Sequence, residues 1–316
     1  MPKYIIMMVL TLFIILFSST AVAHDGWSQT NTPIIEVGEV SFVELLFGNH
    51  SNDHASYRID GTWNPDNTSI YVTAPNGEKI NISDTLFYTG ELQDTPDSRL
   101  GVNNYYISSF SSSLPGAYII SVEGDQVFAH GDVASRTLRS AKSFVAVSEV
   151  PTMSYVQIFE GFDQQVNQDR AELVPLFNPA AITPDEEVSV QFLMKGEPKA
   201  NTEISVIRRS TSESQTFTTN NDGIINFKTG PADYYLLRAK PSSDESVEGE
   251  FDQTYYEATM TFQVQNGNGL SLEGLQEALT TEVPNTENSV NPFMYLSILL
   301  TIGLGGTLIY AFKRIS

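Results

Sequence analysis

Short runs in which apolar and polar residues alternate are the feature that most limits how this chain can fold. Residues 256–264 show the pattern most clearly, with Glu257, Thr259, Thr261 and Gln263 between the apolar positions. The apolar positions are Tyr256, Ala258, Met260, Phe262 and Val264. A period of two is typical of strands that bury one face. The sequence therefore predicts an all-β fold.

Similar runs recur at short spacing along the middle of the chain. In the second half they are 171–177, 187–195, 203–209, 214–219, 224–228, 233–240 and 254–264. In the first half they are 40–47, 69–74, 78–83, 103–110, 117–123 and 142–147. Residues 218–228 read as a hairpin that turns at Asp222-Gly223. We expect two β-sandwich domains, 24–148 and 171–265, with 149–170 as a connector that includes a helical turn. The second domain is expected to be immunoglobulin-like or transthyretin-like.

The two ends of the chain predict export and anchoring. Residues 1–23 combine Lys3, an apolar stretch and a small-x-small end at Ala21-Val22-Ala23, which is typical of a cleaved signal peptide; the alternative is an uncleaved anchor. Residues 292–312 contain no charged residue and are long enough to cross a bilayer, so we expect a transmembrane helix. Lys313 and Arg314 follow it and favour a cytoplasmic tail, 313–316. Residues 266–291 read as an acidic stalk.

Composition excludes several classes of function. The 316 residues include no Cys, which excludes a disulfide framework, a thiolate metal site and a Cys nucleophile. The formal net charge is −21, and residues 24–290 hold all 38 acidic residues but only 14 of the 17 basic ones. This balance argues against nucleic acid as a partner, because phosphate binding needs a basic surface. Solubility in a salty exterior explains the charge as well as any binding role does.

Common catalytic motifs are absent from the sequence. It contains no Walker loop, no dinucleotide glycine motif after a strand, no G-x-S-x-G elbow and no H-E-x-x-H. We therefore predict a protein that is not an enzyme.

The histidines are the residues that point to a ligand. All four, His24, His50, His54 and His130, lie in the first half of the chain. His24 would be the first residue after signal cleavage, so its amine and its ring together could chelate one metal ion. Imidazole nitrogen suits nickel, cobalt, copper and zinc, and Asp25 or Asp53 could add oxygen ligands or orient a ring. The plain alternative is that these histidines are solvated surface side chains.

Several short motifs follow one another in a set order along 24–265. In the first domain they are His24-Asp25-Gly26-Trp27, Gly48-Asn49-His50, Ala74-Pro75-Asn76-Gly77, Pro115-Gly116-Ala117-Tyr118 and Ala141-Lys142-Ser143-Phe144-Val145. In the second they are Glu172-Leu173-Val174-Pro175-Leu176, Asn178-Pro179, Gly196-Glu197-Pro198 and Asn221-Asp222-Gly223. In this order they resemble one family of exported proteins, described as periplasmic components of cobalt/nickel transport, or nickel-uptake-associated domains of unknown function. Asn49 separates Gly48 from His50 where the family has them adjacent, which makes His54 an alternative ligand.

The resemblance implies nickel or cobalt as cargo and a membrane metal transporter as partner. Our leading hypothesis is a membrane-anchored extracytoplasmic accessory protein, with His24, His50, His54 and His130 as metal ligands. A second hypothesis is a surface spacer or adhesive protein that binds no metal. A third, ranked lowest, is a copper-dependent oxidative enzyme with an N-terminal His.

Overall fold

The computed structural model describes residues 25–48, 63–89, 105–130 and 133–267. All of them belong to one compact unit, Met1–Asn268. The predicted signal peptide, stalk, transmembrane helix and tail lie outside the described residues. Within these ranges no helix is long and apolar enough to span a bilayer.

The described residues form strands in three sheets, with very little helix. The first sheet has the order β1 (Asp25–Thr30), β3 (Val40–Gly48), β7 (Tyr106–Ser111), β6 (Phe87–Tyr88). The central sheet has the order β14 (Ser214–Thr218), β13 (Glu203–Arg208), β16 (Asp233–Ala239), β18 (Gln253–Val264), β9 (Val133–Ser148), β8 (Gly116–His130), β4 (Thr68–Thr73), β5 (Lys79–Asn81), with β17 (Ser242–Ser243) and β2 (Ile34–Glu36) paired at its side. The third sheet comprises β10 (Ala171–Pro175), β11 (Glu187–Met194), β12 (Glu197–Pro198) and β15 (Ile224–Lys228).

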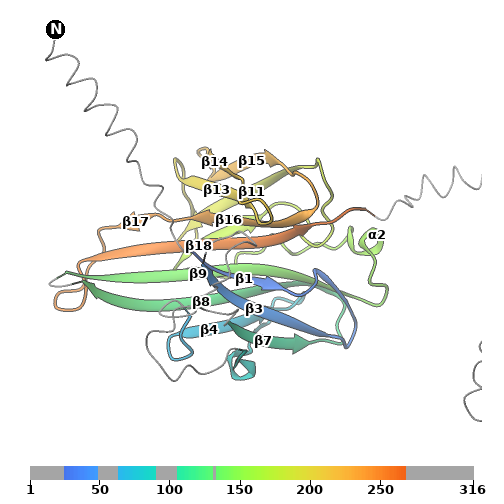
Figure 1. Cartoon of the computed structure of the whole chain (residues 1–316), viewed down its shortest axis with the longest axis horizontal. Helices are drawn as coiled ribbons and strands as arrows, with labels where there is room; N and C mark the ends of the chain where they lie inside the picture. The colour runs from blue at the N-terminus through green and yellow to red at the C-terminus, as the bar shows by residue number, and fades with distance from the viewer. Residues whose placement is uncertain (1–24, 49–62, 90–104, 131–132, 268–316) are drawn as a thin grey trace, which may run out of the picture. The chain divides into compact units, whose positions relative to one another are not determined.

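The central sheet is covered on both faces, which makes the arrangement sandwich-like (Figure 1). One face packs against the first sheet through a cluster that includes Val43, Trp63 and Ile120. The other face packs against the third sheet through a larger cluster that includes Phe192, Leu237 and Met260. Burial of apolar side chains on both faces is the main source of stability for such layers.

Both halves of the chain contribute strands to the central sheet. β18 from the second half pairs in parallel with β9 from the first, with Glu257 opposite Arg139. The two strands lie side by side in the middle of the molecule (Figure 1). The sequence predicted sandwich layers but not this sheet shared by 24–148 and 171–265. The connector 149–170 contains one helical turn, α2 (Met153–Val156).

The predicted strand runs of the second half agree closely with the structure, whereas in the first half β8 (Gly116–His130) and β9 (Val133–Ser148) are much longer than the predicted 117–123 and 142–147. Each of the seven runs in 171–264 coincides with a strand to within two residues at either end. The hairpin predicted over 218–228 is wrong in one respect. The chain does turn there, with Gly223 at a φ of 73°, but β14 joins the central sheet while β15 pairs with β11 of the third. The turn therefore connects two layers.

β1 lies outside every predicted strand run. Its residues, Asp-Gly-Trp-Ser-Gln-Thr, show no alternation, yet all six are buried. A small 3-10 turn, η1 (Ser83–Thr85), and the two-residue β6 were also not predicted. β1 is the element that positions the candidate site.

Candidate functional site

The described chain begins at a buried carboxylate. Asp25 opens β1 and has no exposed surface. Its two oxygens contact the Arg238 guanidinium and the Lys240 amine, one each. A buried carboxylate is tolerated when cations and hydrogen bonds compensate its charge. Arg238 of β16 and Lys240, which follows this strand, therefore fix the start of β1.

A second ion pair lies beside the first. Glu257 accepts a hydrogen bond from the Gly26 N–H at 3.0 Å and one from Arg139 Nε at 2.8 Å. Lys240 Nζ lies 3.7 Å from the same carboxylate. We call Asp25, Arg139, Arg238, Lys240 and Glu257 the N-terminal charge cluster. It joins β1, β9, β16 and β18 at one point.

Side chains of the central sheet also bind the free edge of β1. Thr259 Oγ1 donates to the Gly26 carbonyl at 2.9 Å, and Thr261 Oγ1 donates to the Ser28 carbonyl at 2.6 Å. Tyr234 donates to the Thr30 carbonyl at 3.2 Å. An edge strand would otherwise leave these carbonyls unpaired. The alternate polar residues of β18 are thus the partners that β1 lacks on that side.

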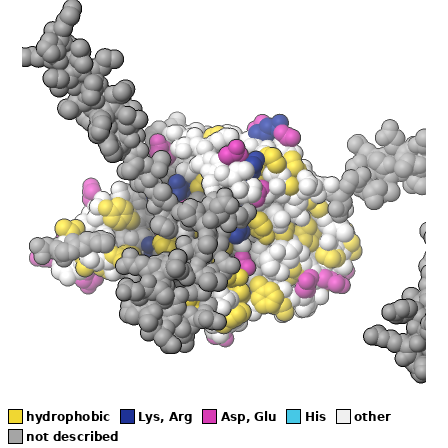
Figure 2. All heavy atoms as spheres, in the orientation of Figure 1, with side chains coloured by type: hydrophobic (Ala, Val, Ile, Leu, Met, Phe, Trp, Pro, Cys, Tyr) yellow, Lys and Arg dark blue, Asp and Glu magenta, His cyan; other side chains and the backbone are white. Residues whose placement is uncertain are grey.

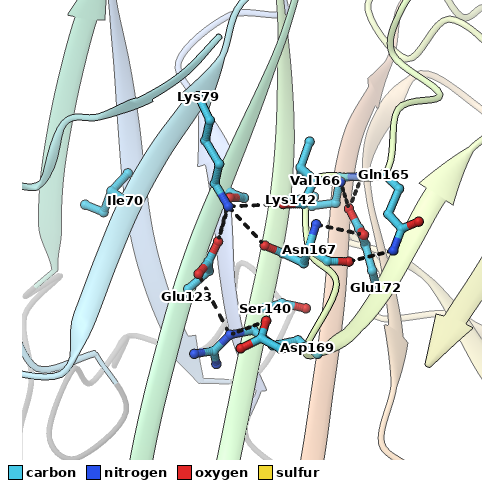
Figure 3. Close-up of polar contacts among 12 residues, drawn as sticks. Ile70, Lys79, Glu123, Ser140, Lys142, Gln165, Val166, Asn167, Asp169 and Glu172 are labelled. Carbon is cyan, nitrogen blue, oxygen red and sulfur yellow. Dashed lines mark hydrogen bonds and ion pairs between the residues drawn. The ribbon is translucent and has the colours of Figure 1, made fainter. Parts of the chain in front are cut away.

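The opposite face of β9 carries another buried charge pair (Figure 3). Lys142 Nζ lies 2.8 Å from Glu172 of β10, and both side chains are almost completely buried. Glu172 also accepts hydrogen bonds from the backbone N–H groups of Val166 and Asn167 at 3.0 and 3.2 Å. Burial lowers the pKa of the Lys142 amine, and Glu172 opposes that shift. The pair ties the connector and β10 to the central sheet.

A more exposed branch extends the same network. Lys79 of β5 contacts Glu123 of β8 at 2.8 Å and donates to the Val166 carbonyl at 3.1 Å (Figure 3). Its amine also lies 4.4 Å from the centre of the Tyr71 ring. These contacts link β5 and β8 to the connector, so we assign this network to stability.

The predicted metal ligands lie outside the side chains that the structure describes. His24, His50 and His54 fall in undescribed segments, and His130 is described as backbone alone, at the end of β8 opposite Val133. Among the described residues, no group of three His, Cys, Asp or Glu side chains is placed to hold a metal ion. The four-histidine site stays a prediction.

The described strands do show where two of these segments attach. Asp25 lies opposite Gly48 in the β1–β3 register. His24 immediately precedes Asp25, and His50 follows Gly48 by two residues. The two attachment points are therefore neighbours.

Sequence reasoning missed the residues that hold this point. It singled out Asp25, but not Arg139, Arg238, Lys240 or Glu257, as part of the site. The one signal in the sequence is the polar face of 256–264, which includes Glu257. An alternating pattern alone predicts that such a face is exposed to solvent.

The family model described as "Domain of unknown function (DUF4198)" matches residues 21–243. The chain belongs to this family. The match spans β1, the charge cluster up to Lys240 and most strands of all three sheets. Because the family description names no ligand, the resemblance of this DUF4198 chain to cobalt/nickel transport components stays a prediction.

Comparisons with other proteins add little about function. No curated protein matches the chain in sequence. Similar solved structures include the D0-D1 domain of intimin, at 12% identity and a TM-score of 0.20, covering 76% of this chain and 99% of that one. A DUF4785 family protein from Legionella pneumophila has 13% identity and a TM-score of 0.23, over 66% and 49% of the two chains. The Escherichia coli adhesin FdeC has 12% identity and a TM-score of 0.20, over 74% and 63%. We draw no functional conclusion from likenesses of this size.

Proposed function

We propose that this protein is a membrane-anchored extracytoplasmic accessory protein that captures a divalent transition metal ion for a membrane transporter. Nickel or cobalt is the expected cargo, and copper or zinc would also suit the ligands. His24 would bind through its amine and its ring, together with His50, His54 and His130. No catalytic activity is proposed.

The β1–β3 register carries this proposal. Asp25 and Gly48 are partners in the sheet, and Asp25 is held by two cations. Consecutive Cα atoms are 3.8 Å apart, so the links from Asp25 to His24 and from Gly48 to His50 are short. A metal site gains affinity when its ligands start from fixed, neighbouring points. The described scaffold supplies two such points.

Asp25 is a positioning residue in this scheme. Arg238 and Lys240 contact its two oxygens, and its side chain is completely buried. A carboxylate compensated by two cations makes a poor metal ligand. We therefore assign the metal donors to histidine nitrogen and keep Asp25 as the fixed base from which His24 extends.

His130 is expected to contribute least. Its backbone is six residues along β8 from Gly124, which is paired with Arg139 of the charge cluster. At about 3.3 Å per residue, six strand residues span roughly 20 Å. Ligands of one metal ion lie much closer together than that. His24 and His50 are therefore the first pair to test, with His54 as the alternative to His50.

The segments predicted at the two ends of the chain are consistent with this function. A signal peptide at 1–23 would expose His24, and a transmembrane helix at 292–312 would anchor the protein. The stalk, 266–291, would then hold the site at a distance from the membrane. This arrangement suits delivery to a partner in the same membrane. An immunoglobulin-like or transthyretin-like arrangement of 171–265 stays a prediction, and some of its strands share the central sheet with the first half.

The test is metal titration of the full chain, produced with its own N-terminal segment and with its first residue determined by intact mass. Nickel and cobalt are titrated by calorimetry into the parent chain, into His24→Ala and into His130→Ala, which removes the ligand expected to contribute least. We expect one ion per chain, at least tenfold weaker binding for His24→Ala and a smaller loss for His130→Ala. Affinity should also fall with decreasing pH, because protons compete for amine and imidazole nitrogen.

Two results would point elsewhere. A chain that begins at His24 and binds no metal would favour the surface spacer or adhesive hypothesis. A copper complex that cycles between oxidation states in the presence of a reductant would favour the oxidative enzyme.

A further inference from the structure

A polar cavity lies on the first-sheet side of the central sheet, beside the start of β1. Its volume is about 470 Å³, within the range of small-molecule sites. Residues of β13, β16 and the chain next to them line it, including Lys199, Asn201, Glu203, Ser205, Arg238 and Lys240. Arg238 and Lys240 also contact Asp25, so the cavity adjoins the N-terminal charge cluster.

The sheet register explains why these side chains converge. Ser205 of β13 lies directly opposite Arg238 of β16. Glu203 and Lys240 are each two residues away from that pair along their own segments, so strand alternation places them on the same face. Arg238 and Lys240 therefore lie on one face with Glu203 and Ser205, and Lys199, which precedes β13, adds a third cation to the lining.

Several donors in the cavity have no acceptor among the residues that the structure describes. Arg238 gives only its Nη1 to Asp25, and within the described residues its Nε and Nη2 make no contact. The Lys199 amine, the Ser205 hydroxyl and the Asn201 side-chain amide likewise make no contact with another described side chain or carbonyl. A guanidinium with two free nitrogens can receive two oxygens of one carboxylate or phosphate.

The local charge runs against that of the whole chain. The protein has 17 basic residues and a net charge of −21. On the face shown in Figure 2, Lys and Arg side chains appear as small, separated patches. Three of the side chains that line the cavity are cationic and one, Glu203, is acidic. Arg238 and Lys240 also offset Asp25 and Glu257 beside the cavity. The cationic excess of the lining itself favours an anionic ligand.

We propose that this cavity binds a small organic anion through carboxylate or phosphate oxygens. Arg238 supplies the paired donors, Lys199 and Lys240 supply charge, and Ser205 supplies a hydrogen bond. The proposal does not depend on metal binding, since every residue that it uses is distinct from the predicted metal ligands.

The experiment uses the full chain, freed of metal and of chelator, with citrate and inorganic phosphate as probes. Binding is measured by calorimetry at low and at physiological ionic strength. Lys199→Glu is the informative variant, because Lys199 is exposed and stands outside the charge cluster. Lys228→Glu is the matched control, since it makes the same charge change on β15 of the third sheet. Melting temperatures establish that both variants fold.

We expect one anion per chain, with Lys199→Glu at least tenfold weaker and Lys228→Glu close to the parent. Citrate binding alone would identify a carboxylate ligand, and phosphate binding alone a phosphoryl ligand. Ser205→Ala should weaken the same probe by a smaller factor. The proposal is overturned if neither probe binds, or if both lysine variants weaken binding equally, as a general charge effect would require.

Discussion

The two faces of β18 are both buried, but they are stabilised by different interactions. Toward the third sheet, Tyr256, Met260 and Phe262 pack in a large apolar cluster. Toward β1, Glu257, Thr259 and Thr261 make hydrogen bonds to backbone groups of an edge strand. One face gains stability from apolar area, and the other from the satisfaction of polar groups that burial would otherwise leave unpaired.

This difference shows what an alternating pattern can and cannot indicate. Apolar residues at every second position identify a buried face reliably. Polar residues at the other positions indicate a face that is not packed by apolar groups, which is usually solvent. Here those positions receive a polar strand instead, and the charge cluster forms where that strand begins.

The largest effect is expected on the apolar face. Phe262→Ala should destabilise the chain by about 3–5 kcal/mol, because it removes a buried ring that stacks on Tyr235 and meets Phe177 edge-on. Urea unfolding measures the change. Ile158→Ala, at a residue that is 73% exposed, is the control and should change stability by less than about 0.5 kcal/mol. Equal effects of the two variants would contradict the assigned core.

A smaller effect is expected where the polar face carries charge. Glu257→Gln keeps the shape but removes the counter-charge of Arg139, so we expect a loss of about 1.5–3 kcal/mol. Thermal unfolding of Glu257→Gln, of Arg139→Gln and of the double variant measures it. Removing both charges should recover part of the loss, since no buried guanidinium is then left without a carboxylate. A double variant as unstable as the sum of the single ones would show that the two residues do not interact.

The hydroxyl groups that bind β1 should each contribute less. Thr261→Val removes the donor to the Ser28 carbonyl, and we expect a cost of about 1 kcal/mol. Amide hydrogen exchange of β1 should accelerate at the same time. Thr216→Val on β14 is the control, because Thr216 is exposed. Unchanged protection of β1 in Thr261→Val would mean that the side chain does not secure the strand.

The smallest effect on stability is expected in the β8–β9 hairpin, where the ion pair between Arg136 and Asp125 is only partly buried. The hydrogen bond from Arg136 holds the pKa of Asp125 below its usual value. A lowered carboxyl pKa contributes stability above the unfolded-state pKa and loses it as pH falls through the folded-state value. Because the side chains are 35% and 38% exposed, solvent screening limits the contribution to under about 1 kcal/mol.

Asp125→Asn should therefore lower stability slightly at pH 7 and not at all at pH values below the folded-state pKa. Denaturant midpoints measured across that range test this expectation. If the difference in unfolding free energy between the parent chain and Asp125→Asn grew as the pH fell, the assigned ion pair would be contradicted.

Most of the fold could be predicted from local pattern. Strand positions such as 187–194 and 254–264 follow from side-chain alternation, which is a property of neighbouring residues. The parallel pairing of β18 with β9, and the division of β14 and β15 between two sheets, depend on contacts between distant segments. Single-strand patterns carry no information about which sheet a strand joins.

The candidate site was less predictable than the fold. Asp25 could be singled out because of its place beside a predicted cleavage point. Arg238, Lys240 and Glu257 could not, because their role depends on a strand that shows no alternation and lies more than 200 residues away. The four histidines are visible in sequence, but their number alone does not say which of them share one ion.

The most direct measurement of the central claim concerns the amine of His24. Nickel affinity is compared by calorimetry between a chain that begins at His24 and one that carries a single additional Gly before it. The ring of His24 is present in both, but the added residue moves the free amine out of the chelate. The account predicts at least tenfold weaker binding for the extended chain, about 1.4 kcal/mol. Equal affinities, or no binding by either chain, would contradict it.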